Sequence, residues 1–263
     1  MNIRWLIALM ALAAMILCAC GEKERVLKSE VIVLENTDQI VPLGDSLAKP
    51  LLYRNIPALN SHHIDETKNR FIAIILPAIL IAKYQLAQDQ KNIRALFGKV
   101  NWEVEDSTFY LHQKERFKAN DLEDLVGRMM THPNSIILAQ AAVESGWGSS
   151  RFFREGNNLF GIWAYRNDEP RIPANEDNVH LRKYSDISES IEDYFETLGR
   201  ARPYREFRKA RTAYNNIYDL LPHLKYYSER GKDYTDQLAA IIRQNNLTQY
   251  DHYQIDPSYF FEE

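Results

Sequence analysis

The fold is decided by the stretch Ala139-Gln140-Ala141-Ala142-Val143-Glu144-Ser145-Gly146-Trp147-Gly148. Small and apolar residues at helical spacing predict a helix that its neighbours approach closely. Gly146 and Gly148 end this helix, because glycine readily takes the left-handed conformation of a helix stop. Glu144 is a lone carboxylate in the last turn, where the helix carbonyls repel an anion. Repulsion and partial desolvation raise the pKa of a carboxyl group, so Glu144 is a candidate general acid.

Helical signals lie on both sides of this segment. Asp65 is a predicted N-cap, and the apolar run 71–82 predicts a buried helix that is kinked or broken at Pro77. Asn120 and Glu123 have the spacing of a capping box, which predicts a helix through Met130. Further helices are expected at 186–198, 204–211, 218–225 and 233–245.

One segment departs from the helical pattern. Leu159–Trp163 is a predicted apolar strand, and Val179–Tyr184 is its predicted return strand after a polar stretch at 167–178. The sequence therefore predicts a mostly helical α+β domain with a large helical lobe and a small β-hairpin lobe.

Composition excludes several classes of function. The 263 residues are 45% hydrophobic and 26% charged, as in an ordinary folded protein, and the formal net charge is −4. A nucleic-acid-binding protein usually shows a basic patch, so we expect no nucleic-acid partner. The seven histidines lack zinc-site spacing, and the sequence has no glycine-rich phosphate loop and no Gly-x-Ser-x-Gly elbow. We expect no metal and no cofactor.

The N-terminal region has the features of an export signal. A single positive charge, Arg4, precedes the apolar run 5–17, which is too short to span a bilayer and is typical of a signal peptide at 1–19. The segment Leu17-Cys18-Ala19-Cys20-Gly21 resembles the lipobox of bacterial lipoproteins, and the small Ala19 makes Cys20 the expected lipidation site. Acyl chains on Cys20 would anchor the protein to a membrane, and no retention aspartate follows, which favours the outer membrane facing the periplasm. An uncleaved anchor helix is the alternative.

The rest of the chain divides into a tether and a catalytic domain. Residues 20–62 contain three prolines and no sustained hydrophobic period, which predicts a tether that partly wraps the domain. Residues 63–255 form the predicted domain, with the motifs concentrated in 120–247.

Two motifs together resemble a known family. The segments 142–148 and Asn157-Asn158-Leu159-Phe160-Gly161-Ile162 are similar to the signature of the bacterial glucosaminidases of glycoside hydrolase family 73. The late segment Tyr227-Ser228-Glu229-Arg230-Gly231 is most like the Bax-type branch. The resemblance implies a lysozyme-like fold and hydrolysis of the β-1,4 bond between N-acetylglucosamine and N-acetylmuramic acid in peptidoglycan. It also matches Glu144 to the catalytic acid, and we expect a monomer that binds glycan strands.

Other site residues follow from the same resemblance. A second carboxylate is expected on the hairpin, with Glu176 favoured; the N-acetyl group of the substrate could take its place. Candidate substrate contacts are Tyr227, Tyr234, Asn158 and Trp163. Ordinary roles compete for each of them: ring packing for both tyrosines, core packing for Trp163 and Tyr165, and backbone hydrogen bonding for Asn158. The remaining acidic side chains of the hairpin are Asp168, Glu169 and Asp177.

Two other functions share these features. A lytic transglycosylase would use the same kind of glutamate, but such enzymes usually carry Gly-Leu-Met-Gln, where this chain has Asn-Leu-Phe-Gly-Ile. A non-catalytic lipoprotein that binds the cell wall is the alternative outside enzymes, because active-site residues do not by themselves prove turnover.

Overall fold

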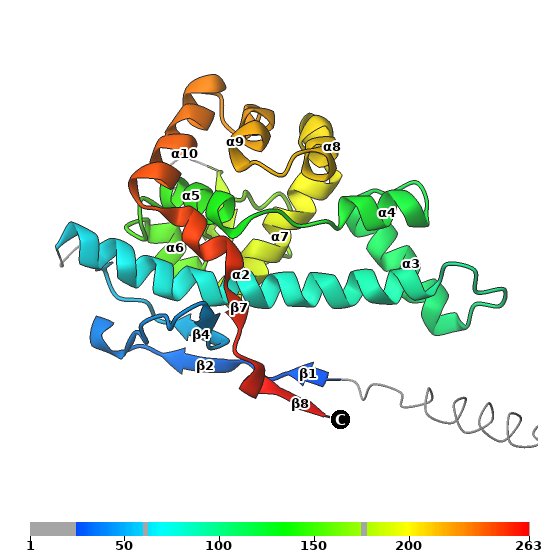
Figure 1. The fold of residues 1–263 in the computed structure, drawn as a ribbon, viewed down its shortest axis with the longest axis horizontal. Coiled ribbons are helices and arrows are strands. Elements are labelled where there is room, and N and C mark those ends of the chain that lie inside the picture. The colour runs from blue at the N-terminus through cyan, green and yellow to red at the C-terminus, as the bar shows by residue number, and fades with distance from the viewer. Residues whose placement is uncertain (1–24, 60–62, 175–177, 263) are drawn as a thin grey trace, which may run out of the picture. The chain divides into compact units, whose positions relative to one another are not determined.

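Helix α2 (Ile64–Ala95) is the central element of the computed structural model, which describes residues 25–59, 63–174 and 178–262 (Figure 1). Its residues 71–82 are buried, and the helix continues through Pro77, so the predicted break does not occur. The helix is long and apolar enough to cross a membrane, but 72% of its most apolar 18-residue stretch is buried inside the protein. Such burial identifies a core helix of the domain.

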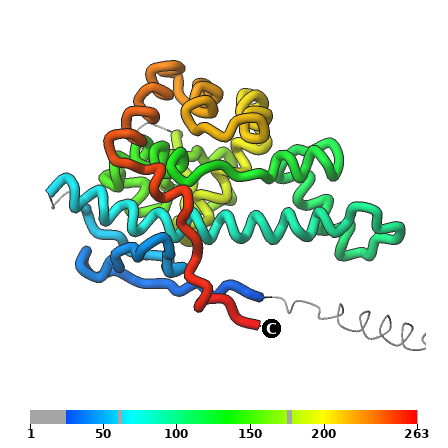
Figure 2. Tube along the Cα trace, in the orientation of Figure 1, coloured from blue at the N-terminus to red at the C-terminus, as the bar shows by residue number. Residues whose placement is uncertain are grey.

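Other helices pack against α2 and form the main core. These are α4 (Leu122–Arg128), α5 (Asn134–Ser145) and α7 (Ile187–Arg200). On α7, Ile187, Ile191, Phe195 and Leu198 are all buried and recur at helical spacing, so one face of this helix joins the core. Helix α3 (Val104–Phe117) packs on α4 and α7. Figure 2 shows the long trace of α2 with α5 and α7 on one side.

The predicted tether is ordered where the structure describes it. Strand β2 (Glu30–Val33) pairs in parallel with β4 (Leu51–Arg54), and β3 (Leu47–Ala48) pairs with β7 (Gln254–Ile255). Buried side chains of this segment include Leu34, Ile40, Leu51, Leu52, Tyr53 and Leu59. Residues from Ser29 to Asp256 form one compact unit, so the described part of this segment from Ser29 onward packs with the helices, and the boundary at residue 62 stays a prediction. Strands of two to four residues are too short to leave a detectable period in the sequence.

The β-hairpin lobe uses a different first strand from the predicted one. Strand β5 (Arg171–Pro173) pairs antiparallel with β6 (His180–Arg182), and β6 lies inside the predicted return strand. Residues 159–163 are not a strand, and only Trp163 makes an isolated bridge, to Leu181. The hairpin was therefore predicted in the correct part of the chain with one strand misplaced.

The C-terminal helices lie close to their predicted positions. The predicted helices begin and end within two residues of the expected limits. The order of elements along the chain, with helices before and after the hairpin, is also the expected one. The mostly helical α+β class is confirmed. The elements that match the predicted helices are α8 (Arg205–Ala213), α9 (Ile217–Leu220) together with η4 (Leu221–Leu224), and α10 (Lys232–Gln244); the 3₁₀ helices η3 (Arg202–Tyr204) and η5 (Leu247–His252) were not predicted.

A second, small unit contains both ends of the described chain. Strand β1 (Arg25–Leu27) pairs antiparallel with β8 (Phe260–Glu262), which follows η6 (Pro257–Tyr259). The predicted signal peptide and Cys20 lie outside the described residues.

Candidate active site

Helix α5 positions Glu144 at its C-terminal end. The helix is almost wholly buried, and Ala139, Ala141 and Ala142 are among its buried residues, whose small side chains allow neighbouring elements to approach closely. Its N-terminus is held by the Asp251 carboxylate, which accepts hydrogen bonds from the backbone N–H of Ser135 (2.7 Å) and from the Ser135 hydroxyl (2.9 Å). An anion at a helix N-terminus is stabilising, so this contact fixes the start of the helix that carries Glu144.

A tight turn after Glu144 directs the chain away from the helix. Gly146 takes the left-handed conformation (φ 58°) as the C-cap, and the Ser145 hydroxyl donates to the carbonyl of Ala141 (2.6 Å) and accepts from the N–H of Gly148 (3.1 Å). Gly148 has φ +84°, and a Cβ there would lie 3.1 Å from Leu59 and 3.2 Å from Phe71. Both glycines are therefore required by backbone conformation, and Gly148 also by close packing.

Tyr234 contacts the candidate acid directly. This residue of α10 is fully buried, and its hydroxyl donates a hydrogen bond to Oε1 of Glu144 at 2.9 Å. The same hydroxyl accepts from the Nε2 of Gln140, 3.1 Å away. Gln140 lies one helical turn before Glu144 and is fully buried. The structure thus brings together two predicted site residues that are 90 positions apart, with Gln140 behind them.

The hydrogen bonds continue inward from Gln140. The Tyr194 hydroxyl donates to Oε1 of Gln140 (2.6 Å), and Nε2 of His132 lies 2.8 Å from the same hydroxyl. Because the single hydroxyl proton of Tyr194 goes to Gln140, Nε2 of His132 must carry a proton and donate it. Burial lowers the pKa of His132 well below its usual value, so its ring is neutral with Nδ1 unprotonated. Sequence analysis did not assign His132, Gln140 or Tyr194 to the site.

We call the hydrogen-bonded series His132, Tyr194, Gln140, Tyr234 and Glu144 the donor chain. Each member donates toward the next, and the last proton is directed at the carboxylate. Only Gln140 carried a usable sequence signal, because it is four residues before Glu144 and so shares its helix face. The donor chain runs, in order, from His132 through Tyr194, Gln140 and Tyr234 to Glu144.

Burial raises the pKa of Glu144 above its usual value. The Tyr234 hydrogen bond and the positive charge of Arg230 oppose this shift without cancelling it. The direction agrees with the expectation from sequence. The same two groups stabilise the carboxylate once it has lost its proton.

A tyrosine cluster extends from Tyr234. The Tyr227 ring stacks on the Tyr234 ring with centroids 5.7 Å apart and an angle of 10° between planes. Tyr204 lies 6.0 Å from Tyr227. The charge of Glu144 contributes to raising the pKa of both Tyr204 and Tyr227, after burial as the larger cause. The two predicted tyrosines therefore pack on each other beside Glu144, and only Tyr234 bonds to it.

The remaining predicted contacts differ in their exposure. Asn158 is 2% exposed and its amide bonds the backbone of Ile162 and Arg182, so it holds the loop to β6. Trp163 is 53% exposed and Tyr165 is 81% exposed. The core position expected for these two rings is therefore wrong, and Trp163 is open to a ligand.

The structure describes two of the four acidic residues of the hairpin, and both are paired with arginines. Asp168 pairs with Arg166 (2.5 Å) and Glu169 with Arg182 (3.1 Å). Glu176 and Asp177 lie outside the described residues. Within residues 25–59, 63–174 and 178–262, no three His, Cys, Asp or Glu side chains are grouped closely enough to hold a metal ion.

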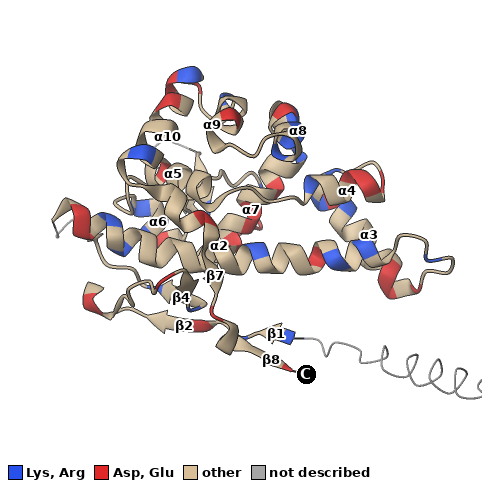
Figure 3. Ribbon diagram, in the orientation of Figure 1, with Lys and Arg blue, Asp and Glu red and all other residues tan. Residues whose placement is uncertain are grey.

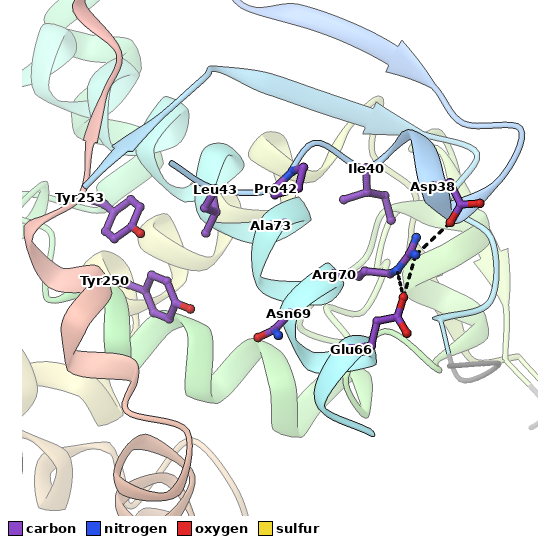
Figure 4. A pocket seen from close by; sticks show the side chains of 10 residues that line it. All are labelled: Asp38, Ile40, Pro42, Leu43, Glu66, Asn69, Arg70, Ala73, Tyr250 and Tyr253. Atoms are coloured by element: carbon purple, nitrogen blue, oxygen red, sulfur yellow. Dashed lines mark hydrogen bonds and ion pairs between the residues drawn. The ribbon is translucent and has the colours of Figure 1, made fainter. Parts of the chain in front are cut away.

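A separate cavity of about 530 Å³ opens between the N-terminal segment, α2 and η5 (Figure 4). Tyr250 and Tyr253 lie at one end of it and Arg70 at the other. Arg70 forms ion pairs with the carboxylates of Asp38 (2.9 Å) and Glu66 (2.8 Å), so its positive charge is already compensated. None of the predicted site residues lines this cavity.

Comparison with known proteins identifies the class of the domain. Residues 119–247 match the Glucosaminidase family, described as mannosyl-glycoprotein endo-beta-N-acetylglucosaminidase, and this part of the chain belongs to that family. The resemblance inferred from the Glu144 and Asn158 motifs is confirmed.

The chain is also similar to individual proteins. The chain is 31% identical over 127 residues to protein bax of Escherichia coli (46% of each chain), and 28% identical over 137 residues to exo-glucosaminidase LytG of Bacillus subtilis (47% of each). It thus spans about half the length of these curated relatives. Among solved structures, the catalytic domain of the Listeria monocytogenes autolysin Auto has a TM-score of 0.39 and 24% identity, covering 62% of this chain and 96% of that one. The glycoside hydrolase domain of Salmonella typhimurium FlgJ has a TM-score of 0.37 and 26% identity, covering 51% and 97%.

Proposed function

We propose that the protein is a peptidoglycan hydrolase, an endo-acting β-N-acetylglucosaminidase that cleaves the β-1,4 bond between N-acetylglucosamine and N-acetylmuramic acid. Membership of the glucosaminidase family supports the class of reaction. The observation that carries the proposal is the half-buried Glu144, whose pKa burial raises while the Tyr234 hydroxyl donates to its Oε1.

The hydrogen bond from Tyr234 decides which oxygen of Glu144 acts as the acid. Oε1 accepts the tyrosine proton, so the acidic proton of the neutral carboxyl group resides on Oε2. As the glycosidic bond breaks, Oε2 transfers this proton to the leaving oxygen. The new carboxylate is then stabilised by the Tyr234 hydroxyl and by the charge of Arg230. These interactions strengthen as charge develops, which is what lowers the barrier.

The second half of the reaction has two candidate groups. Asp168 and Glu169 are paired with arginines. Glu176 is the second carboxylate that we propose, on the resemblance to the family. The alternative is attack by the N-acetyl group of the substrate, which needs no second carboxylate. Measuring the anomer first released, for the wild type and for Glu176→Gln, separates the two. Inversion, or a loss of rate in the variant, supports Glu176; retention with an unchanged rate supports substrate assistance.

Substrate contacts complete the proposal. The exposed ring of Trp163 offers a face on which a sugar ring can stack, and Tyr227 lies beside the reacting carboxyl group. Asn158 is proposed to act indirectly, because its amide is bonded to backbone and holds the loop that precedes Trp163.

The decisive experiment is mass spectrometry of fragments released from purified peptidoglycan. We expect N-acetylglucosamine at the new reducing ends, and a fall of about 10²- to 10⁴-fold in rate for Glu144→Gln. Glu155→Gln is the matched control, since Glu155 is an exposed glutamate paired only with Arg151 (3.3 Å). Anhydromuramic ends would instead indicate a lytic transglycosylase. Wall binding without any release would indicate a non-catalytic lipoprotein.

The proposed location is the cell envelope, with the chain lipid-anchored through Cys20 to the outer membrane and facing the periplasm. Support comes from the family, whose substrate is peptidoglycan, and from the lipobox-like segment. Membrane fractionation of the wild type and of Cys20→Ala tests the anchor. Release of the variant into the soluble periplasmic fraction is expected, and retention of the variant in the membrane would argue for an uncleaved anchor helix.

A further inference from the structure

A second cavity, of about 600 Å³, is strongly basic. It lies among the end of α3, α4, the end of α7, η3 and α8, and five arginines and two lysines line it against a single carboxylate, Asp124. Figure 3 marks lysine and arginine positions in blue along the ribbon of α4 and α8. A cleft lined by one sign of charge concentrates ligands of the opposite sign. We call this cavity the arginine pocket.

Two of its arginines have no counter-charge. Arg128 is paired with Asp124 (2.9 Å), and Arg200 with Glu196 (2.5 Å). The side chains of Arg202 and Arg205 are exposed and have no hydrogen-bond or ion-pair partner among the described residues.

Arg208 is repelled by the charges of two neighbouring arginines. Arg208 donates to the carbonyls of Leu198 and Ala201 (2.8 Å each) and is fixed in place. Burial lowers its pKa, and the charges of Arg128 and Arg205 lower it further. An anion bound in the arginine pocket would relieve this repulsion and would meet two unpaired guanidinium groups.

One turn of chain joins the arginine pocket to the tyrosine cluster. In η3 the N–H of Arg205 bonds the carbonyl of Arg202, and side chains three residues apart eclipse one another in a 3₁₀ turn. Arg202 and Arg205 therefore project to the same side, into the arginine pocket. Tyr204 projects elsewhere, to 6.0 Å from the Tyr227 ring, which stacks on the partner of Glu144.

We propose that the arginine pocket binds the carboxylate groups of the short acidic peptides carried by the muramic acid residues of peptidoglycan, so that peptide-bearing glycan is the preferred substrate. The planar guanidinium fork matches a carboxylate in two parallel hydrogen bonds, and several carboxylates on one peptide can use several arginines. The arginine pocket adjoins the tyrosine cluster, as required for a peptide attached to the strand being cut. This inference rests on the proposed function.

The test compares two substrates and three proteins. Soluble glycan strands are prepared from one batch of peptidoglycan, either with their peptides or after an amidase has removed them. The wild type, Arg202→Gln/Arg205→Gln, and the charge-matched control Arg54→Gln/Arg94→Gln are assayed on both. Arg54 and Arg94 are exposed and lie outside the arginine pocket.

We expect the wild type to have a higher kcat/KM on peptide-bearing strands, through a lower KM. The ratio between the two substrates should fall about tenfold or more in Arg202→Gln/Arg205→Gln, since the loss of one charged hydrogen bond already corresponds to a factor of this size. The ratio should be unchanged in the control pair. Raising the salt concentration should reduce the wild-type preference, because exposed charges are screened.

Direct binding separates this inference from the proposed function. The free peptides released by the amidase are titrated calorimetrically into each protein. Peptide binding that is lost in Arg202→Gln/Arg205→Gln supports the arginine pocket even if no strand is cut. Equal rates on the two substrates, with no peptide binding by an active enzyme, would overturn the inference and leave the hydrolase assignment standing. Loss of binding only to vesicles that contain anionic phospholipid would show that the pocket faces a membrane, and would also overturn it.

Discussion

Replacing Tyr234 by phenylalanine tests how the site holds its acid. The substitution keeps the ring and its stack on Tyr227 but removes the hydroxyl that donates to Oε1 of Glu144. A hydrogen bond to a charged group contributes about 1.5–3 kcal/mol, and one pKa unit corresponds to about 1.4 kcal/mol. Glu144 is partly accessible to solvent, so the lower end of the range applies. The pKa of Glu144 should therefore rise by about one unit.

The assay is the pH dependence of kcat/KM on glycan strands. Only the protonated form of Glu144 can act as the acid, so activity falls as pH rises through its pKa. Because the Tyr234 hydrogen bond favours the ionised form, its loss should move this alkaline limb upward by about one pH unit. The rate at the optimum should also fall, since the new carboxylate loses a donor. Carbon-13 NMR of the Glu144 carboxyl group would measure the same shift without turnover.

Tyr227→Phe is the control for this experiment. Its ring belongs to the same stack, but its hydroxyl does not bond Glu144. We expect its alkaline limb to stay within about 0.3 units of the wild-type position, as expected for a neighbour without a direct bond. A limb that does not move in Tyr234→Phe would refute the role given to the hydrogen bond. An equal shift in both variants would assign the effect to repacking of the cluster.

Three further predictions concern the stability of the fold and the positioning of Tyr234. Burial raises the pKa of Glu192 from 4.5 to about 7, so its ionisation destabilises the fold as pH rises through this interval. Glu192→Gln should raise the free energy of unfolding in urea by about 1–3 kcal/mol at pH 8 and by almost nothing at pH 4; a pH-independent effect would contradict this. Gly148→Ala should lower stability by about 1–3 kcal/mol because of its positive φ and close neighbours, whereas Gly127→Ala, in α4 with open space, should raise it by about 0.4–1 kcal/mol. Gln140→Leu removes the donor to the Tyr234 hydroxyl, and we expect kcat to fall about tenfold with little change in KM; a loss confined to KM would argue against a positioning role.

Local signals in the sequence predicted much of the fold. Helix α5 ends at its two glycines because a left-handed stop is a property of the residue itself. Helix α7 begins after Asp186, whose side chain accepts from the N–H groups of Ser188 and Glu189, as the capping pattern predicts. The cap of α4 was misplaced by one residue, since Asp121 rather than Asn120 accepts the N–H of Asp124.

Features that depend on distant partners were not predictable. Residues 159–163 look like a strand, yet only their end pairs with β6, where the N–H of Arg182 bonds the carbonyl of Ile162 and the N–H of Ala164 bonds the carbonyl of His180, while the side chain of Asn158 holds the start of this loop. The helix continues through Pro77 because the burial of the surrounding apolar side chains stabilises it by more than the loss of the backbone hydrogen bond that proline removes. Tyr234 comes from 90 residues further along the chain, and only the resemblance to the family named it as a site residue, because spacing alone cannot select it from fifteen tyrosines; its direct bond to Glu144 was not predicted.

The donor chain also explains why glutamine is the informative replacement for Glu144. In Glu144→Gln the side-chain carbonyl oxygen can still accept from the Tyr234 hydroxyl, so every hydrogen bond back to His132 is retained. The amide nitrogen then occupies the position of Oε2 but has no proton acidic enough to transfer. Glu144→Ala would instead leave a buried hydroxyl without its acceptor, which costs about 1–3 kcal/mol and disturbs the fold as well as the chemistry. A loss of turnover in the glutamine variant, with an unchanged unfolding midpoint, would therefore report the missing proton alone.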